Sequence, residues 1–473
     1  MSGRIVFDRY PFASSLPLHS RLGARLGLMT CVTLTLAGIG LASPLFADAV
    51  SLTETVTDTR VFHVEGTTDI SGSLETIAGE GKSRSLPLKA KGTIHYKERR
   101  LPGSGRDAEA LREFREYMND LGTEIDVSGQ IASTRLRPVR RLIIAQGRRE
   151  GIDYYTPLGS LTYNELELLQ YPGESLCCIG MLPTVPVEIG ETWQPESWVV
   201  QMLTSTEAVI ESACTCKLEK IEKNLATISY IGKVEGAING AEGTVHVKGE
   251  FDYDLVGKHI AGLRQEQSET RSIGSVTPGL KITAVTEWTR KPTEEIGKLT
   301  DEQAERIPLD PQPEWLLLSM ESPWNVRFDY DRNWHLFHET DKVAVFRLVE
   351  DGAVVAQFNV SRISTAAPGE HTSEEQFQAD IRQSLGKQLK DITQAEQLKT
   401  NDGRFLFRVT AVGQVKNIEM TWYYYLCAAP SGQQIAFVFS IETKLLEQLA
   451  NRDLGIVESL QFVTGDKKPA VAK

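Results

Sequence analysis

The cysteines are the residues of this sequence whose spacing most suggests chemistry. Cys177 and Cys178 are adjacent, and Cys214 and Cys216 are separated by one residue. Because side chains alternate along a strand, Cys214 and Cys216 should point inward together, from an apolar face that also carries Ile210. An extended Cys177–Cys178 pair would place its thiols on opposite faces, so at most one of them should reach the second pair.

Several chemistries could use these four thiols. An oxidising compartment favours disulfides over thiolate metal sites, so we favour one disulfide bond between Cys177 or Cys178 and Cys214 or Cys216. Buried free thiols are the main alternative. The spacing of C-C with C-x-C is unusual for zinc, and C-x-x-C, the common redox spacing, is absent from the sequence. Cys427 lies far along the chain and is expected to stay free.

Motifs for catalysis or metal binding are incomplete. The segment GESLC, residues 173–177, resembles a G-x-S-x-G nucleophile motif, but Cys177 stands where the second glycine is required. His335 and His338 would point to opposite faces of a strand, which disfavours a metal site. Two carboxylate pairs at glycosidase-like spacing are Asp252 with Asp254 and Asp329 with Asp331. In a chain with 63 acidic residues such pairs arise by chance, so we predict no catalytic residue, metal ligand or cofactor.

The N-terminus has the pattern of a secretory signal peptide, assigned to residues 1–49. A basic region precedes the apolar run of residues 26–42, and Ala47 and Ala49 form a small-residue cleavage site. An uncleaved N-terminal anchor is the alternative, although the run is short for a membrane span. We therefore expect an exported protein, periplasmic or extracellular, with no stable membrane span once the leader is cleaved.

The charge balance narrows the class of partner. Residues 1–47 hold four arginines and one aspartate, so their removal would change the net charge from −12 to −15. An acidic surface of this size argues against nucleic acid and anionic membranes as partners. Unknown proteins or apolar ligands remain as the expected partners.

A segment rich in proline and charge, residues 291–318, divides the chain. Prolines at 292, 308, 311 and 313 favour extended backbone and exclude a sheet interior. We predict a β-rich domain at residues 50–290, a linker at 291–318, a second domain at 319–465 and a disordered tail at 466–473.

The first domain should be a curved antiparallel β-sheet with short helices. Residues 244–255 alternate apolar and polar side chains, as do residues 280–288, which indicates half-buried strands. Thr162 and Glu165 form a capping box at the start of one helix. Three helices are predicted, at residues 107–121, 161–169 and 196–203.

The second domain mixes strands and helices, which indicates an α+β fold, an α/β sandwich. An amphipathic helix at residues 373–389, with Ser373 as its N-cap, carries Phe377, Ile381 and Leu385 on one stripe. Residues 442–462 should form a final helix. The aromatic run at residues 421–427 is apolar on both faces, which favours an interior strand over a ligand platform. The predicted strands are residues 324–330, 343–349, 356–363, 404–410, 419–428 and 433–441.

Trp324 with VRFDYDRNW, the Asp351-Gly352 turn, APSGQQIAFVF and the closing IVESLQF give this domain a resemblance to the PsbP/Mog1/DcrB-like fold. The resemblance implies an accessory, binding or assembly role, because that group is mainly non-enzymatic. The whole chain also resembles uncharacterised secreted two-domain proteins of planctomycete bacteria. The first domain is similar in outline to the half-barrels of LolA-type lipid carriers.

Three functions follow as hypotheses. We favour a secreted or periplasmic, non-enzymatic binding or accessory protein of the cell envelope. The alternative of a carrier for lipid or another apolar ligand requires a large apolar cavity in the β-rich domain. The alternative of a hydrolase requires acids or histidines gathered in one cleft.

Overall fold

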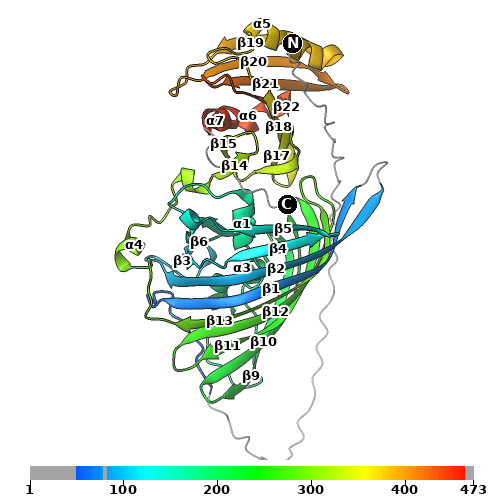
Figure 1. The fold of residues 1–473 in the computed structure, drawn as a ribbon. Coiled ribbons are helices and arrows are strands. Elements are labelled where there is room, and N and C mark those ends of the chain that lie inside the picture. The colour runs from blue at the N-terminus through cyan, green and yellow to red at the C-terminus, as the bar shows by residue number, and fades with distance from the viewer. Residues whose placement is uncertain (1–48, 78–81, 464–473) are drawn as a thin grey trace, which may run out of the picture.

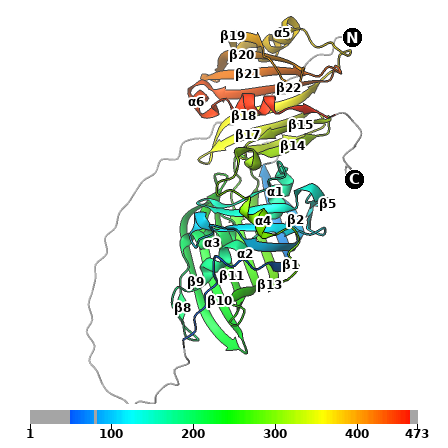
Figure 2. The same cartoon turned by 90° about the vertical axis from the view of Figure 1, so that its left-hand side faces the viewer.

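The computed structural model describes residues 49–77 and 82–463. All but one residue of the predicted signal peptide at 1–49, and the predicted tail at 466–473, lie outside the described residues. The described chain is rich in β-structure and forms two large antiparallel sheets and one small one. Figures 1 and 2 show the larger sheet curving around short helices, with the second large sheet at one end of it.

The larger sheet has thirteen strands, which lie between Phe62 and Pro292, in the part of the chain predicted to be β-rich. Eleven of them follow one another in the order β7-β6-β3-β2-β1-β13-β12-β11-β10-β9-β8, and β4 and β5 form a hairpin against β2. The bounds are β1 (Phe62–Ile77), β2 (Ser83–Arg100), β3 (Arg112–Tyr117), β4 (Gly122–Val127), β5 (Gln130–Arg135), β6 (Leu142–Arg148), β7 (Gly151–Tyr155), β8 (Thr192–Trp193), β9 (Ala208–Glu222), β10 (Leu225–Ile238), β11 (Ala241–Asp254), β12 (His259–Arg271) and β13 (Gly279–Pro292).

The alternating patterns identified these long strands correctly. On β11 the side chains of Val245, Val247 and Phe251 are buried, whereas the residues between them face outward. Ile210 departs from its predicted face and is 74% exposed. A β-bulge between Glu235 and Gly236 of β10 shifts the register with β9. The alternation of side chains that points Cys214 inward is therefore interrupted before Ile210.

Three short helices fill the concave side of this sheet (Figure 2). They are α1 (Tyr163–Leu169), α2 (Ser175–Cys178) and α3 (Ser197–Thr204). The predicted capping box of α1 is present, with the Thr162 hydroxyl accepting from the Glu165 amide and the Glu165 carboxylate accepting from the Thr162 amide. Side-chain amides of Gln265 and Gln267 donate to the last carbonyls of α3, which fixes this helix on β12.

The predicted helix at residues 107–121 is wrong. Residues 112–117 form strand β3, preceded by a single 3-10 turn, Ala108–Ala110. Glu113 and Arg115 face the helices, and Phe114 packs on the opposite side with Ile144 and Tyr155. A strand buried on both faces loses its alternation, so the apolar residues fell at helical spacing without forming a helix.

The segment between the two large sheets packs on the outer face of β3. Leu299 and Ala304 are buried in one cluster with Phe114, and Ala304 lies in helix α4 (Asp301–Glu305). The Arg99 guanidinium donates to the Leu299 carbonyl and to Asp301. This proline-rich segment is therefore held against the first sheet by an apolar cluster and by hydrogen bonds.

The second large sheet has the strand order β16-β17-β18-β22-β21-β20-β19, with every pair antiparallel. Helix α5 (Glu374–Leu385) covers one face, and Ser373 caps it as predicted. The small sheet and two helices lie at the other face (Figure 1). The bounds are β14 (Leu318–Ser322), β15 (Val326–Tyr330), β16 (Trp334–Glu339), β17 (Val343–Glu350), β18 (Ala353–Ile363), β19 (Leu389–Gln397), β20 (Phe405–Val415), β21 (Ile418–Ala428), β22 (Gln434–Glu442), α6 (Leu446–Leu449), α7 (Arg452–Glu458) and β23 (Gln461–Phe462).

Two predictions for this domain have clear outcomes. The aromatic strand β21 is an interior strand as predicted, because Trp422 and Tyr424 are buried on one face and Tyr425 on the other. The single final helix at residues 442–462 is wrong. Ala450 and Asn451 have positive φ angles, which breaks it into α6 and α7, and residues 461–462 pair with β15 as a strand.

The parts of the chain before and after the proline-rich segment contact each other directly. Leu161 and Leu318 form a β-bridge, and the Arg332 guanidinium donates to the Tyr154 carbonyl at 2.6 Å. One cluster of buried apolar side chains runs from the concave face of the first sheet into the second domain. Across residues 49–77 and 82–463, no helix has the length and hydropathy needed to cross a bilayer.

Candidate functional site

The four predicted site cysteines lie inside the first domain as free, buried thiols. Cys177 and Cys178 belong to helix α2, and both thiols donate to the Glu174 carbonyl, at 3.2 and 3.3 Å. The two cysteines are helical and both buried, so the extended backbone assumed in the sequence argument is absent, and the expectation that at most one of them reaches Cys214 or Cys216 stays a prediction. Cys214 and Cys216 point inward from β9 and are hydrogen-bonded to each other.

Tyr230 lies near both cysteine pairs. Burial raises the pKa of Tyr230, and negative charge on any of the four thiols would raise it further. The described residues contain no group of three or more His, Cys, Asp or Glu side chains arranged to hold a metal ion. The disulfide bond between the two pairs is not formed in the structure, and it stays a prediction for the exported, oxidised protein.

The predicted carboxylate pairs hold local structure. Asp252 accepts a hydrogen bond from the Thr227 hydroxyl at 2.8 Å, and Asp254 accepts from backbone amides of the turn that follows it. Asp329 and Asp331 each face an arginine, at 3.5 and 3.9 Å. His335 and His338 lie on β16, where a bulge separates them.

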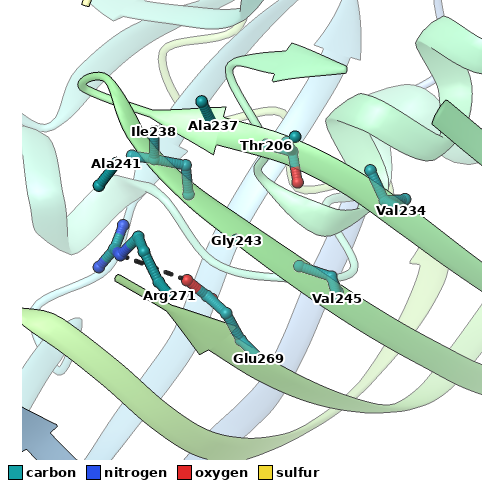
Figure 3. Close-up of a pocket in the computed structure, with 10 residues that line it drawn as sticks. Thr206, Val234, Ala237, Ile238, Ala241, Gly243, Val245, Glu269 and Arg271 are labelled. Carbon is teal, nitrogen blue, oxygen red and sulfur yellow. Dashed lines mark ion pairs between the residues drawn. The ribbon is translucent and has the colours of Figure 1, made fainter. Parts of the chain in front are cut away.

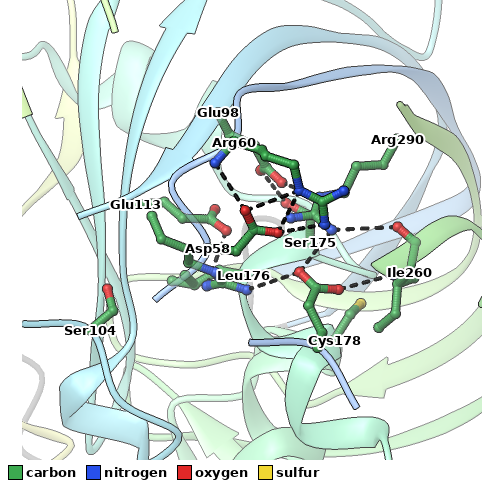
Figure 4. Close-up of polar contacts among 12 residues, drawn as sticks. Asp58, Arg60, Glu98, Ser104, Glu113, Ser175, Leu176, Cys178, Ile260 and Arg290 are labelled. Atoms are coloured by element: carbon green, nitrogen blue, oxygen red, sulfur yellow. Dashed lines mark hydrogen bonds and ion pairs between the residues drawn. The ribbon is translucent and has the colours of Figure 1, made fainter. Parts of the chain in front are cut away.

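A buried network of charged side chains is the most concentrated polar chemistry in the molecule, and the sequence motifs did not reveal it. It lies between β2, β3 and β13 on one side and α2 on the other (Figure 4). Each member is at most 5% exposed. The members are Glu54, Glu98, Arg100, Glu113, Arg115, Glu174 and Arg290.

Arg115 is the central member of this network. Its guanidinium donates to Glu113 at 2.6 Å and forms two hydrogen bonds to Glu174, at 2.5 and 3.1 Å. Glu98 lies 3.7 Å away, and the guanidinium also stacks over the Tyr96 ring, 4.7 Å from its centroid. The register of β2 and β3 places Glu98 opposite Arg115, so cross-strand pairing brings opposite charges together.

Arg290 joins the network from β13. It donates to Glu98 at 2.6 Å and lies 2.8 Å from Glu54, and it covers the Phe62 ring at 3.7 Å from the centroid. Glu54 also accepts from the Ile260 amide. The network therefore ties the chain that precedes β1 to two neighbouring strands.

The carboxylates of the network are held in different protonation environments. Burial and then the negative charge of Glu113 raise the pKa of Glu98 to about 7. Burial would raise the pKa of Glu113 too, but Arg100, Arg115 and Arg290 outweigh it and lower that pKa to about 2. Opposite shifts in adjacent carboxylates indicate that one of them accepts a proton far more readily.

A chain of hydroxyl groups leads away from Glu98. The Ser175 hydroxyl donates to Glu98 at 2.8 Å and is 2.9 Å from the Tyr96 hydroxyl, which is 2.7 Å from that of Tyr171. Ser175 is the serine of the GESLC segment. Among the described residues, its hydroxyl contacts two carboxylates, an arginine and a tyrosine inside the core, an environment that lacks the histidine base a serine nucleophile requires.

The cavities near the first sheet are small or open. The pocket in Figure 3, between the ends of β10, β11 and β12, has a volume of about 10 Å³, space for one water molecule. Glu269 and Arg271 form an ion pair there at 3.6 Å. A wider surface cleft of about 530 Å³ includes Arg60, Arg99, Glu294 and Asp301 in its lining.

One signal in the sequence could have pointed to the network. Residues 97–100 and residues 112–117 each carry neighbouring charged side chains within a strand. Because side chains alternate along a strand, these charges point to both faces of the sheet, whereas only a solvated face calls for charged side chains. The partners Glu54, Glu174 and Arg290 are distant in the sequence. Only the fold brings them to the same place.

No protein-family model matches the chain, and no curated protein matches it. Three solved structures share weak similarity with it. A Bacteroides thetaiotaomicron protein is 10% identical with a TM-score of 0.24, over 32% of this chain and only 50% of its own length. Cyanobacterial PsbP (CyanoP) from Synechocystis is 14% identical with a TM-score of 0.25, over 31% of this chain and 92% of that protein. A Pseudomonas aeruginosa protein of unknown function is 12% identical with a TM-score of 0.21, over 33% of this chain and 99% of that protein.

These similarities are too weak to assign an activity. PsbP is among the neighbours, as the sequence resemblance indicated, but the similarity is low. The resemblance to secreted planctomycete proteins stays a prediction.

Proposed function

We propose that this protein is an exported, non-enzymatic binding or accessory protein of the cell envelope. In this proposal the first domain is a rigid base, and the second domain is a PsbP/Mog1-like α/β sandwich that binds a partner protein. The observation that carries the proposal is the placement of the reactive groups. The buried carboxylates, arginines and thiols of the first domain are at most 6% exposed, so a substrate has no access to them.

The first domain has the features of a scaffold. Its concave face is filled by three helices, and guanidinium groups pair with its buried acids and cross-link β2, β3, β13 and α2. A network of this kind fixes the relative positions of strands, because each separation would leave a buried charge unpaired.

The second domain leaves one end available for a partner. Contacts with the first domain include β14, the loop after β15 and the turn between β17 and β18, whereas α5 and β19 lie at the far end (Figure 1). Their exposed side chains include Glu375, Arg382, Lys390 and Asp391, which carry both signs of charge. A mixed polar surface suits a reversible contact with a folded protein more than insertion into lipid.

The edge strand β19 is shaped against strand addition. It has two register shifts, one between Leu389 and Asp391 and one between Ile392 and Gln394. Bulges twist an edge and interrupt its row of free backbone groups. A partner would therefore contact side chains of α5 and β19 and would not extend the sheet.

The two alternative functions have less support. A carrier of an acyl chain would need an apolar cavity of roughly 300 Å³ or more. The pocket beside the concave face holds about 10 Å³, and the larger cleft is lined partly by charged residues. For a hydrolase, acids do gather, but those around Arg115 are at most 5% exposed, which leaves no room for a substrate to contact them.

Site-specific photo-crosslinking in the native host tests the proposal. A photoreactive amino acid at Gln383, exposed on α5, should crosslink to a discrete envelope protein. The same probe at Lys220, exposed on β9 of the first domain, is the matched control and should not. Recovery of the protein with the cytoplasm, or equal crosslinking from both positions, would contradict the proposal.

A further inference from the structure

We propose that the first domain contains a buried proton-binding site, in which Glu98 takes up one proton from solvent through the hydroxyl groups of Ser175, Tyr96 and Tyr171. This inference does not depend on the proposed function. It rests on the charges that face one another in the network and on the continuous hydrogen bonds that leave it.

The network contains one more carboxylate than guanidinium. The elements around Glu98 contribute Arg100 from β2, Glu113 and Arg115 from β3, Arg290 from β13, Glu54 from the chain before β1, and Glu174 from the start of α2. Four glutamates thus face three arginines. An unbalanced charge without water is costly, and one added proton removes it.

Other titratable groups near the network do not supply the missing charge. Burial and then Arg290 lower the pKa of His259, which favours its neutral form. Burial raises the pKa of the neighbouring tyrosines, so they also stay neutral. Asp58 and Arg60 pair with each other at the rim. The buried thiols of Cys177 and Cys178 both donate to the Glu174 carbonyl.

Glu98 is the member best placed to hold the proton. Glu174 is bound by two hydrogen bonds from Arg115, and Glu113 by Arg115 together with Arg100 at 3.1 Å. Glu98 has one close arginine, Arg290, through one oxygen. Its other oxygen meets the Ser175 hydroxyl.

The hydroxyl chain can carry a proton in either direction. With Glu98 ionised, Tyr171 can donate to Tyr96, Tyr96 to Ser175, and Ser175 to Glu98. A proton that water delivers to Tyr171 displaces each hydroxyl proton by one position, and Glu98 receives the proton of Ser175. Tyr171 is 9% exposed whereas Tyr96 is 0% exposed, so Tyr171 is the most exposed member of the hydroxyl chain.

The sign of the pH dependence follows from the direction of the shift. The pKa of Glu98 is about 7 in the folded protein, against an ordinary value of 4.5. Its contribution to stability is therefore fully present below about pH 4.5 and is lost as the pH rises through about 7. Glu113 is shifted the other way, so its contribution to stability is fully present above about pH 4.5 and is lost only as the pH falls toward about 2.

Infrared difference spectroscopy of the full chain tests this site. Between about pH 5 and about pH 8, wild type should show the carbonyl band of a protonated, buried carboxyl group at the lower pH only. Glu98→Gln should lose this band and should also lose the fall in urea midpoint with rising pH. Glu269→Gln is the matched control, because burial also raises the pKa of Glu269, and it should keep the Glu98 band.

A second variant covers the case in which Glu98→Gln does not fold. Ser175→Ala keeps all seven charges but interrupts the hydroxyl chain. It should keep the carboxyl band while slowing its shift after transfer into D₂O at least several-fold. Identical band intensities in wild type and Glu98→Gln, or unchanged exchange in Ser175→Ala, would overturn the proposal.

Discussion

Arg115 shows how strongly single residues are constrained in this molecule. It is 0% exposed and forms hydrogen bonds with Glu113, Glu174 and Ser175. Burial alone would lower the pKa of Arg115. The neighbouring carboxylates outweigh this cost and raise that pKa, so the guanidinium group keeps its charge. This one guanidinium group joins β3 to Glu98 of β2 and to Glu174 at the start of α2.

Replacement of Arg115 by methionine should be severely destabilising. The variant keeps much of the volume but leaves Glu113 and Glu174 without their main partner, and loss of one partner of a buried pair costs roughly 3–5 kcal/mol. Urea unfolding followed by circular dichroism measures the loss. Arg264→Ala is the control, because Arg264 is 74% exposed in its pair with Glu287, and it should change stability little.

The cysteines give a second prediction at this scale. In protein purified from the cell envelope, unreduced peptide mapping should find a peptide with Cys177 or Cys178 joined to one with Cys214 or Cys216. Such a bond closes a long loop and would stabilise by roughly 3 kcal/mol. Cytoplasmically produced protein should instead contain free thiols, as the structure describes. Free thiols in both preparations would rule the bond out.

Helix α1 shows that local signals are reliable where a side chain meets its own backbone. The Thr162 and Glu165 capping box was recognisable in the sequence and is present in the structure. Glu165 also accepts from Arg137, which in turn contacts Glu321 of the second domain. This short helix is therefore part of the connection between the domains.

Thr162→Ala should destabilise the protein by about 1 kcal/mol, because the α1 amide of Glu165 loses its acceptor. The change is measured as a shift of the urea midpoint. Thr215→Ala removes a threonine from the exposed face of β9 and serves as the control. Equal effects of the two variants would argue against a capping role.

Strand β3 shows where local signals fail. Its segment was assigned to a helix because Leu111, Phe114 and Met118 recur at helical spacing. Both faces of the strand are covered, one by the charged network and one by the proline-rich segment. When solvent contacts neither face of a strand, apolar and polar side chains no longer alternate. The spacing of apolar residues then cannot distinguish a strand from a helix.

At the scale of the whole molecule, two hairpin turns meet at the domain boundary. The turn of Asn239 and Gly240 joins β10 to β11, and that of Asp351 and Gly352 joins β17 to β18. A Cβ atom on Gly240 would lie 2.3 Å from the Gly352 carbonyl oxygen. The two turns are thus packed backbone against backbone.

Gly240→Ala should loosen the contact between the domains without unfolding either one. Limited proteolysis should cut the connecting segment, residues 293–317, several-fold faster, and small-angle scattering should report a larger radius of gyration. Gly129→Ala is a matched control, because Gly129 also ends a turn with positive φ but has open space around it. An equal response from both variants would assign the effect to backbone strain alone.

Features that depend on neighbours along the chain can be predicted without the fold. These include the alternating strands, the caps of α1 and α5 and the apolar interior strand β21. The helical turn that buries both Cys177 and Cys178, the break at Ala450, and above all the meeting of Glu54, Glu98, Glu174 and Arg290 depend on the folded chain. A buried charge is specified by its partner, and these partners come from elements that are adjacent in space and distant in sequence.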